Sequence, residues 1–446
     1  MKTPLVDFVK QYRDKNPVRL HMPGHKGQPL LGCEPLDITE VSGADVLYRA
    51  EGILKESQQN ATDLFGTQKT LYSCEGSSLC IRAMLYLALV QSTTESRTVL
   101  AARNVHKTFL SAAALLDLNV RWIYSENETS ILSCRITADA VEKALSSLSE
   151  KPFALYVTSP DYLGHTVDVQ VLAEVCHKYG ILLLCDNAHG AYLHFLPESA
   201  HPIQSGADLC CDSAHKTLPV LTGGAYLHIR KNAPLALSEN AERALSLFAS
   251  TSPSYLILQS LDYANAYLSD GYREKLTSFA QRMDALKKTL LQHGYQTVGN
   301  EPLKLTLAPK VYGYTGCELA AYLEEKNITC EFSDPDYVVL MCTPETPQEA
   351  LDALKTALLA LPSREPIYTL PPKLQIPERA YTPRQAVFSK TEVLPTKETL
   401  GRILAEEGVS CPPAVPILSC GEVVNQSAIE LFGYYGIEKI RVVAED

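Results

Sequence analysis

Several features that would place this chain in a special class are missing from its sequence. No apolar run reaches the roughly 18–20 residues that a membrane-spanning helix needs, and the start of the chain has no apolar signal-peptide core. Basic residues are not in surplus, since a formal net charge of −11 argues against a nucleic-acid groove or an anionic membrane surface as partner. We therefore expect a cytoplasmic protein whose partner is a small molecule.

The sequence also lacks any Cys-x-x-Cys pair, although it contains 13 cysteines. Most of them lie in apolar segments, such as Cys185 in LLLCD and Cys342 in VLMC. Such positions are typical of buried thiols in a reducing compartment rather than of a disulfide framework. With 46% hydrophobic and 20% charged residues, the composition is that of an ordinary globular protein.

The order of apolar runs and helical stretches indicates an α/β fold. Between about residues 68 and 230 the two alternate, which predicts a mostly parallel sheet with helices on both faces and ligands at the carboxyl ends of its strands. We predict strands over 98–102, 120–124, 153–158, 181–186, 208–212 and 225–229, and helices over 137–147 and 169–179.

Three regions are predicted along the chain. Residues 1–60 are rich in Gly and Pro and are expected to form an irregular N-terminal arm, residues 61–294 a large domain, and residues 295–446 a smaller α+β region. In the last region, 362–383 carries six prolines and predicts a linker or extended strap, followed by a terminal subdomain over 384–446. Residues 254–293 are expected to be largely helical, with further helices over 317–326 and 347–361 and strands over 336–342 and 438–443.

A lysine and a carboxylate at strand ends suggest the chemistry. Lys216 follows an apolar strand and lies thirty positions after Asp186, which ends the nonpolar run 181–185. A deprotonated lysine in a dry site can bind an aldehyde, and a carboxylate at such a point needs a cationic partner. Pyridoxal phosphate requires both, Lys216 for the Schiff base and Asp186 to keep the ring nitrogen protonated. The alternatives are a solvated loop lysine, and an arginine or helix N-terminus beside Asp186.

Hydroxyl and glycine residues would supply a phosphate pocket. Gly76, Ser77 and Ser78 open a predicted helix, whose free N–H groups suit an anion. An ordinary helix cap is the alternative for this run. Ser213 and His215, which flank Lys216 in sequence, are placed to hydrogen-bond the same phosphate.

Further candidates lie near other strand ends and helix starts. Ala188 is small enough to pack against a flat ring, with His189 at its rim, and His106 could stack on the other face. For His106 the alternative is a structural hydrogen bond at a helix N-terminus. Thr251 and Ser252 form a second hydroxyl cluster, for which a capping turn is the alternative.

No metal site is predicted. His21 and His25 have the i, i+4 spacing of a metal pair, but Pro23 and Gly24 between them forbid a regular helix.

Taken together, these motifs resemble the Orn/Lys/Arg decarboxylase family of pyridoxal phosphate enzymes, which have the aspartate aminotransferase fold (fold type I). The combination of HKTL with DNAHG is specific, and the similarity covers nearly the whole chain. The matching runs are HMPGHKG at 21–27, GSS at 76–78, RNVHK at 103–107, DNAHG at 186–190, SAHKTL at 213–218, TSPSY at 251–255, PP at 412–413 and GE at 421–422.

The resemblance assigns a role to each candidate. It implies that Lys216 forms the Schiff base, that Asp186 partners the pyridine nitrogen, and that His106 and Ala188 lie on the two faces of the ring. Residues 61–294 then form the cofactor-binding domain. The phosphate ligands implied are Gly76, Ser77, Ser78, Ser213 and His215.

The resemblance also implies a homodimer with shared active sites. In it, Thr251 and Ser252 reach the phosphate of the neighbouring subunit, while His25 and Glu422 lie near the substrate. The reaction implied is α-decarboxylation of arginine, lysine or ornithine to agmatine, cadaverine or putrescine, as in polyamine biosynthesis. Lys216 or His189 would return the proton to the α-carbon.

Two departures from the family pattern leave the substrate open. The family usually has Tyr-Pro-Pro-Gly-Ile-Pro and Pro-Gly-Glu, where this chain has CPPAVP at 411–416 and SCGE at 419–422. No segment resembles the receiver-like domain of the family's large inducible members, so the short, dimer-forming type is expected. An aminotransferase or lyase on the same fold, or an inactive decarboxylase-like binding subunit, are the alternative functions. An aminotransferase would need an arginine for the α-carboxylate, and the sequence does not place one.

Overall fold

The computed structural model of the chain describes residues 1–125, 130–407 and 415–445. The chain forms two compact units, one made of residues 1–93 and 169–276 and the other of residues 94–168 and 277–446. Each unit therefore combines segments that are far apart in sequence.

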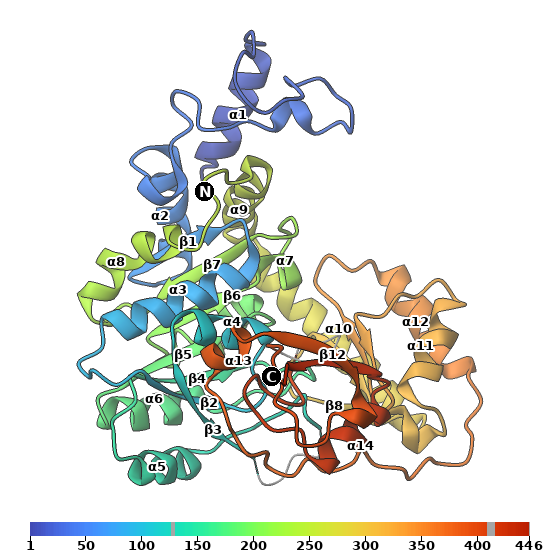
Figure 1. Cartoon of the computed structure of the whole chain (residues 1–446). Helices are drawn as coiled ribbons and strands as arrows, with labels where there is room; N and C mark the ends of the chain where they lie inside the picture. Colours follow the sequence, from blue (N-terminus) through green and yellow to red (C-terminus); the bar gives the residue numbers. More distant parts are fainter. Residues whose placement is uncertain (126–129, 408–414, 446) are drawn as a thin grey trace. The chain divides into compact units, whose positions relative to one another are not determined.

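The first unit holds the Lys216 region of the chain (Figure 1). Its elements are α1 (Pro4–Asp14), α2 (Ile53–Phe65), β1 (Lys69–Ser73), α3 (Gly76–Val90), α6 (Val169–Lys178), β5 (Leu182–Asp186), β6 (Leu209–Asp212), α7 (Ala214–Thr217), β7 (Ala225–Ile229), α8 (Leu235–Ser246), α9 (Tyr255–Leu268) and the start of α10 (Tyr272–Gln292).

The second unit holds the remaining strands of the central sheet and the C-terminal α+β parts. Its elements are β2 (Thr98–Ala102), α4 (Lys107–Leu115), β3 (Asn119–Ile123), α5 (Ala138–Ser147), β4 (Ala154–Thr158), β8 (Thr297–Val298), β9 (Lys304–Leu307), α11 (Gly316–Glu324), β10 (Phe332–Ser333), β11 (Val338–Met341), α12 (Gln348–Ala360), α13 (Pro383–Val387), β12 (Thr391–Pro395), α14 (Gln426–Tyr434) and β13 (Lys439–Val443).

The strands of the large sheet pair in the order β1-β7-β6-β5 within the first unit and β4-β2-β3 within the second. β5 and β6 are parallel, as are β2 and its neighbours β3 and β4. β7 runs antiparallel to β6 and to β1. Helix α3 packs on β1, β6 and β7, and α6 packs on β5 (Figure 1). The predicted mostly parallel sheet flanked by helices is thereby confirmed.

The predicted element bounds agree closely with the structure. β2 and β7 begin and end at the predicted residues, β4, β5 and β6 begin one residue later than predicted, and β3 is shifted by one residue at both ends. Helices α9 and α10 fill most of the stretch 254–293. Strand β1 was not predicted, because Lys69–Ser73 is short and begins with charged and polar residues.

The prediction that residues 1–60 are irregular is wrong for α1 and for the first half of α2. Pro4 occupies the first turn of α1, where its missing N–H costs nothing, so this proline starts a helix instead of breaking one. The carboxylate of Asp262 accepts hydrogen bonds at 3.0 Å from the backbone N–H groups of Leu5 and Val6. This cap comes from α9, and no local pattern could reveal it.

The C-terminal α+β part contains a four-stranded antiparallel sheet with the order β10-β11-β9-β8. Helix α11 packs on β11 and begins with a capping box between Thr315 and Glu318. Helices α11 and α12 and strand β11 correspond to the predicted elements with shorter bounds. Residues 362–378 form neither helix nor strand, as their proline content predicts.

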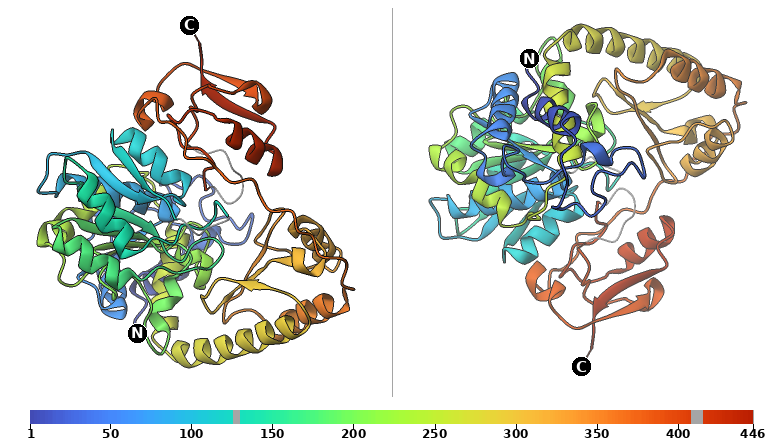
Figure 2. Two further views of the ribbon diagram at one scale, coloured as in Figure 1. Left: turned by 90° about the horizontal axis from the view of Figure 1, so that it is seen from below. Right: turned by 90° about the horizontal axis from the view of Figure 1, so that it is seen from above.

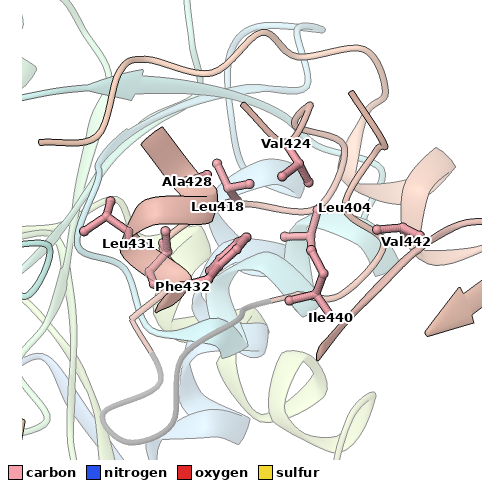
Figure 3. Packing of buried hydrophobic residues seen from close by; sticks show 9 residues of the cluster. Leu404, Leu418, Val424, Ala428, Leu431, Phe432, Ile440 and Val442 are labelled. Atoms are coloured by element: carbon pink, nitrogen blue, oxygen red, sulfur yellow. The ribbon is translucent and has the colours of Figure 1, made fainter. Parts of the chain in front are cut away.

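The terminal subdomain has a core of its own. Helix α14 lies against the antiparallel pair β12 and β13 (Figure 2). A two-stranded ribbon is at best marginally stable in water, and the apolar face that α14 supplies makes this one a folded unit. The cluster consists of Leu404, Ile417, Leu418, Val424, Ala428, Leu431, Phe432, Ile440 and Val442 (Figure 3).

All 12 cysteines within the described residues are free thiols, in agreement with the sequence analysis. Eight of them are buried, including the vicinal pair Cys210 and Cys211 in β6. No helix in the described ranges is both long and apolar enough to cross a membrane.

Candidate active site

Lys216 lies in α7, a single helical turn that directly follows β6. Its backbone N–H donates to the carbonyl oxygen of Ser213 at 2.9 Å, which holds the turn. Its Nζ lies 3.1 Å from Nε2 of His189, a buried residue that follows β5. The structure thus brings two predicted catalytic groups into hydrogen-bond contact from the ends of neighbouring strands.

Asp186 is the last residue of β5 and is 2% exposed. Its Oδ1 accepts a hydrogen bond from the N–H of Ala188 at 3.1 Å and from the thiol of Cys211 at 3.7 Å. Burial, and then the charge of Asp186, raise the pKa of Cys211, so this thiol stays protonated and can donate. The backbone N–H of Ala188 and the thiol of Cys211 thus both support the carboxylate.

The predicted phosphate ligands Ser77 and Ser213 lie together, with Ser213 Oγ donating to Ser77 Oγ at 2.8 Å. Ser77 and Ser78 belong to the first turn of α3, where free N–H groups and the helix dipole favour an anion. Gly76 has φ +68° and donates its N–H to the carbonyl oxygen of Gly223 at 2.8 Å. This contact fixes the start of α3 next to the loop that precedes β7.

His215 faces the same loop. Both its backbone N–H and its Nδ1 lie 3.0–3.1 Å from the carbonyl oxygen of Gly224. Because a carbonyl oxygen only accepts, Nδ1 carries a proton and donates it. The ring is fixed on Gly224, and phosphate binding by His215 stays a prediction.

Thr251 and Ser252 are exposed and precede α9, whose cap is Ser254. The backbone N–H of Ser250 donates to the carboxylate of Glu75 at 2.7 Å, which ties this segment to the start of α3. The capping turn named as the alternative is therefore present, with Ser254 as the capping residue. Contact of Thr251 and Ser252 with a phosphate stays a prediction.

The two histidines of the HMPGHKG run have separate partners. His25 Nε2 lies 3.1 Å from Asp37 Oδ2, and the N–H of Gly27 donates to His25 Nδ1 at 3.0 Å. His21 Nε2 lies 2.7 Å from the hydroxyl of Tyr12. A substrate contact of His25 stays a prediction.

His106 belongs to the second unit, where it caps α4. Its Nδ1 accepts a hydrogen bond from the N–H of Thr108 at 3.2 Å and lies 2.9 Å from the Thr108 hydroxyl. This is the structural hydrogen bond that the sequence analysis named as the alternative. Stacking of the His106 ring on the cofactor stays a prediction.

Glu422, also in the second unit, is 2% exposed and forms a buried ion pair. Its Oε2 accepts from Arg103 Nη2 at 3.0 Å and from the N–H of Ser419 at 2.6 Å. Burial raises the pKa of Glu422 above its ordinary value although Arg103 opposes this. The Arg103 guanidinium also lies over the ring of Trp122, 4.9 Å from its centroid. Of the first altered run, 411–416, residues 411–414 lie outside the described residues.

Sequence reasoning missed a buried network around Asp212, the last residue of β6. Its Oδ2 lies 2.9 Å from His201 Nε2 and 3.1 Å from His228 Nε2, and its Oδ1 accepts from Asn187 Nδ2 at 2.7 Å. Burial opposes ionisation, but the two histidines hold the pKa of Asp212 below its usual range. The sequence carried a signal, because Asp212 ends an apolar strand just as Asp186 does.

The residues of the first unit fit pyridoxal phosphate. They provide an amine, a buried carboxylate and two hydroxyls at a helix N-terminus. Asn187 Oδ1 and Thr217 Oγ1, which flank Asp186 and Lys216 in sequence, are buried and have no hydrogen-bond partner among the described residues. Buried polar atoms in such positions suit a polar ligand.

The sequence model of the Orn/Lys/Arg decarboxylase major domain matches residues 3–298. The chain belongs to the Orn/Lys/Arg decarboxylase family. An arginine decarboxylase of Halalkalibacterium halodurans is 31% identical over 463 residues, which cover 96% of this chain and 92% of the relative.

Solved structures of pyridoxal phosphate enzymes share the fold. The constitutive lysine decarboxylase of E. coli has a TM-score of 0.77 at 17% identity, covering 99% of this chain and 82% of that chain. A structure of SPT with PLP has a TM-score of 0.53 at 14% identity, covering 69% and 75%. This chain is therefore a pyridoxal phosphate-dependent decarboxylase of basic amino acids, which confirms the predicted fold, cofactor and reaction class.

The buried His194 should make stability depend on pH. Burial lowers the pKa of His194 from 6.5 to about 4, so the unfolded chain binds this proton first as the pH falls. The contribution of neutral, buried His194 to the free energy of unfolding is complete above about pH 7. At about pH 5 the free energy of unfolding should be about 2 kcal/mol smaller. His194→Gln keeps a donor for the carbonyl of Leu64 and should remove this loss.

The measurement is the urea unfolding free energy of wild type and variant at both pH values. The exposed His293→Gln serves as the control and should leave the pH dependence unchanged. If the unfolding free energy falls equally between the two pH values in the wild type and in His194→Gln, His194 is not the cause of the pH dependence.

Proposed function

We propose that Lys216 carries the cofactor and that this chain decarboxylates arginine to agmatine and CO₂, a step of polyamine biosynthesis. The contact between Lys216 Nζ and His189 Nε2 is the observation that carries the proposal. The name of the relative from H. halodurans supports arginine over lysine and ornithine.

Pyridoxal phosphate, when bound, supplies an electron sink that accepts the bonding electrons as CO₂ leaves. Asp186 contributes a buried negative charge that stabilises a proton on the ring nitrogen. Ser77 and Ser213, together with the N-terminus of α3, anchor the phosphate. The anchored phosphate and the charge of Asp186 fix the cofactor at two ends and so orient it.

Lys216 and His189 handle the protons. The 3.1 Å between Nζ and Nε2 allows a proton to pass directly between the amine and the imidazole. His189 is 6% exposed, so this exchange is shielded from water. We assign the return of a proton to the substrate α-carbon to this pair.

We propose a homodimer as the working assembly. Exposed leucines and a valine gather in the segment 18–31, with Leu20 and Leu31 at 90% and 91% exposure. Such a concentration of apolar side chains is typical of a protein interface. Thr251 and Ser252 are exposed as well, so a neighbouring subunit can approach them.

We propose the cytoplasm as the location of the protein. The support is the set of free thiols, since eight of the 12 described cysteines are buried and none forms a disulfide within the described ranges. The net charge of −11 supports the absence of a nucleic-acid or membrane partner.

Replacing Lys216 should abolish covalent cofactor binding. The wild type incubated with pyridoxal phosphate should absorb near about 420 nm, and Lys216→Ala should lose this band and the release of CO₂. Lys231→Ala, an exposed lysine of the same unit, is the matched control and should keep both. A wild type that stays colourless after incubation would contradict the assignment of Lys216 as the residue that binds the cofactor.

The substrate preference can be measured directly. Release of CO₂ and amine from arginine, lysine and ornithine should give the highest kcat/KM for arginine. Lysine or ornithine as the better substrate would overturn the choice of arginine but not the reaction. Formation of a keto acid in place of CO₂ would instead indicate transamination.

Shared active sites predict complementation between variants. Mixed Lys216→Ala and Ser252→Ala subunits should recover up to about a quarter of the wild-type activity, because one of the two sites in a mixed dimer is then intact and half of the dimers are mixed. Subunit exchange is verified by mass spectrometry. Exchange without recovery would show that Ser252 acts within its own subunit, next to the α3 start to which Glu75 ties it.

A further inference from the structure

The buried carboxylate of Asp212 joins the ends of the strands that carry the active site. Asp212 is 0% exposed and ends β6 four residues before Lys216. His228, one of its partners, lies in β7, and His228 Nδ1 continues the network to the hydroxyl of Thr70 in β1 at 2.9 Å. One carboxylate therefore links β6, β7 and, through His228, β1.

Hydrogen-bond geometry fixes the protonation of His201. The backbone N–H of Ile203 donates to His201 Nδ1 at 3.2 Å, so this nitrogen has no proton. The ring proton therefore lies on Nε2 and is donated to Asp212 at 2.9 Å. Moving this proton to Nδ1 would place it against the N–H of Ile203, so the donor side of the ring stays on Asp212.

The same geometry argues against a metal ion at this point. His201, Cys210 and Asp212 offer ligand atoms within 4.8 Å of one another. A metal would need the lone pair of His201 Nε2, which carries the proton given to Asp212. The cluster is a hydrogen-bond network.

Asn187 connects this network to the active site. Its side-chain Nδ2 donates to Asp212 Oδ1 at 2.7 Å, and its backbone N–H donates to the carbonyl oxygen of Cys211 at 2.9 Å. Asn187 is thus attached twice to β6. It directly follows Asp186 and precedes Ala188 and His189, so its attachment fixes the backbone from which these side chains project.

We propose that Asp212, held by His201 and His228, is a positioning residue that fixes Asn187 and thereby aligns Asp186 and His189 with Lys216. This inference rests on the proposed roles of Asp186, His189 and Lys216. Asp212 itself reaches these groups through Asn187 and through the backbone of β6.

Asp212→Asn tests the role with nearly unchanged shape. The amide replaces one accepting oxygen by an N–H₂ group, and the donors from His201, His228 and Asn187 can then no longer all be satisfied. Asn187→Ala is the second variant, which removes the link but keeps the charge of Asp212.

Asp208→Asn is the matched control. Asp208 precedes β6 at the opposite end, is 1% exposed, and is held by His177 Nε2 at 3.0 Å and Arg230 Nη2 at 2.7 Å. It also accepts the N–H of Leu183 at 2.9 Å. The control removes a similarly buried carboxylate that directly precedes the same strand but leaves the Asn187 link intact.

Two measurements distinguish positioning from general stability. Absorbance titration of apo-protein with pyridoxal phosphate should show the dissociation constant raised about tenfold, or about 1.4 kcal/mol, in Asp212→Asn and Asn187→Ala. In Asp208→Asn it should change by less than about twofold. Deuterium exchange should rise in the peptide over 186–190 for the first two variants, and in the peptide over 206–210 for the control.

Equal changes of the dissociation constant in Asp212→Asn and Asp208→Asn would overturn the positioning role, as would an unchanged exchange at 186–190. A wild type that binds no pyridoxal phosphate would instead overturn the proposed function. The exchange measurement still tests the Asp212 network in that case, so the two failures are distinguishable.

Discussion

The pairing of β5 with β6 is the constraint on which the active site depends. The parallel register places Asp186 opposite Cys211 and so brings the two strand ends to the same edge of the sheet. The residues that follow, His189 after β5 and Lys216 after β6, then meet at 3.1 Å. A shift of this register by one residue would turn the side chains of the shifted strand to the opposite face and separate the groups.

Burying a charged carboxylate at these strand ends costs free energy, and hydrogen bonds from neighbouring residues offset this cost. Asp186 accepts hydrogen bonds from a thiol and a backbone N–H. Asp212 on the next strand instead accepts from His201, His228 and Asn187. Two carboxylates in similar sequence contexts therefore have different partners, and we propose different roles for them, Asp186 beside the cofactor and Asp212 in the framework.

Local patterns predicted most of the fold because buried parallel strands read as short apolar runs and their helices as amphipathic stretches. The helix α1 was missed because its cap is Asp262, 257 positions from Leu5. The network around Asp212 was missed for a similar reason. Asn187, His201, Asp212 and His228 come from four separate segments, and only Asn187 belongs to one of the matching runs. The sequence indicated Glu422 as a residue near the substrate. Its pairing with Arg103 was not predicted, because it depends on packing between distant parts of the second unit.

The sequence by itself determined the cofactor chemistry, because HKTL after an apolar strand and DNAHG after another place a lysine and a carboxylate at strand ends. It also determined the α/β class and, for the strands that it predicted, their bounds within a residue or two. Only the tertiary structure decided which neighbour each polar group has, such as His189 for Lys216 and Asn187 for Asp212. The physical reason is that a hydrogen bond depends on a few tenths of an ångström between atoms from different strands, and sequence spacing carries no such information.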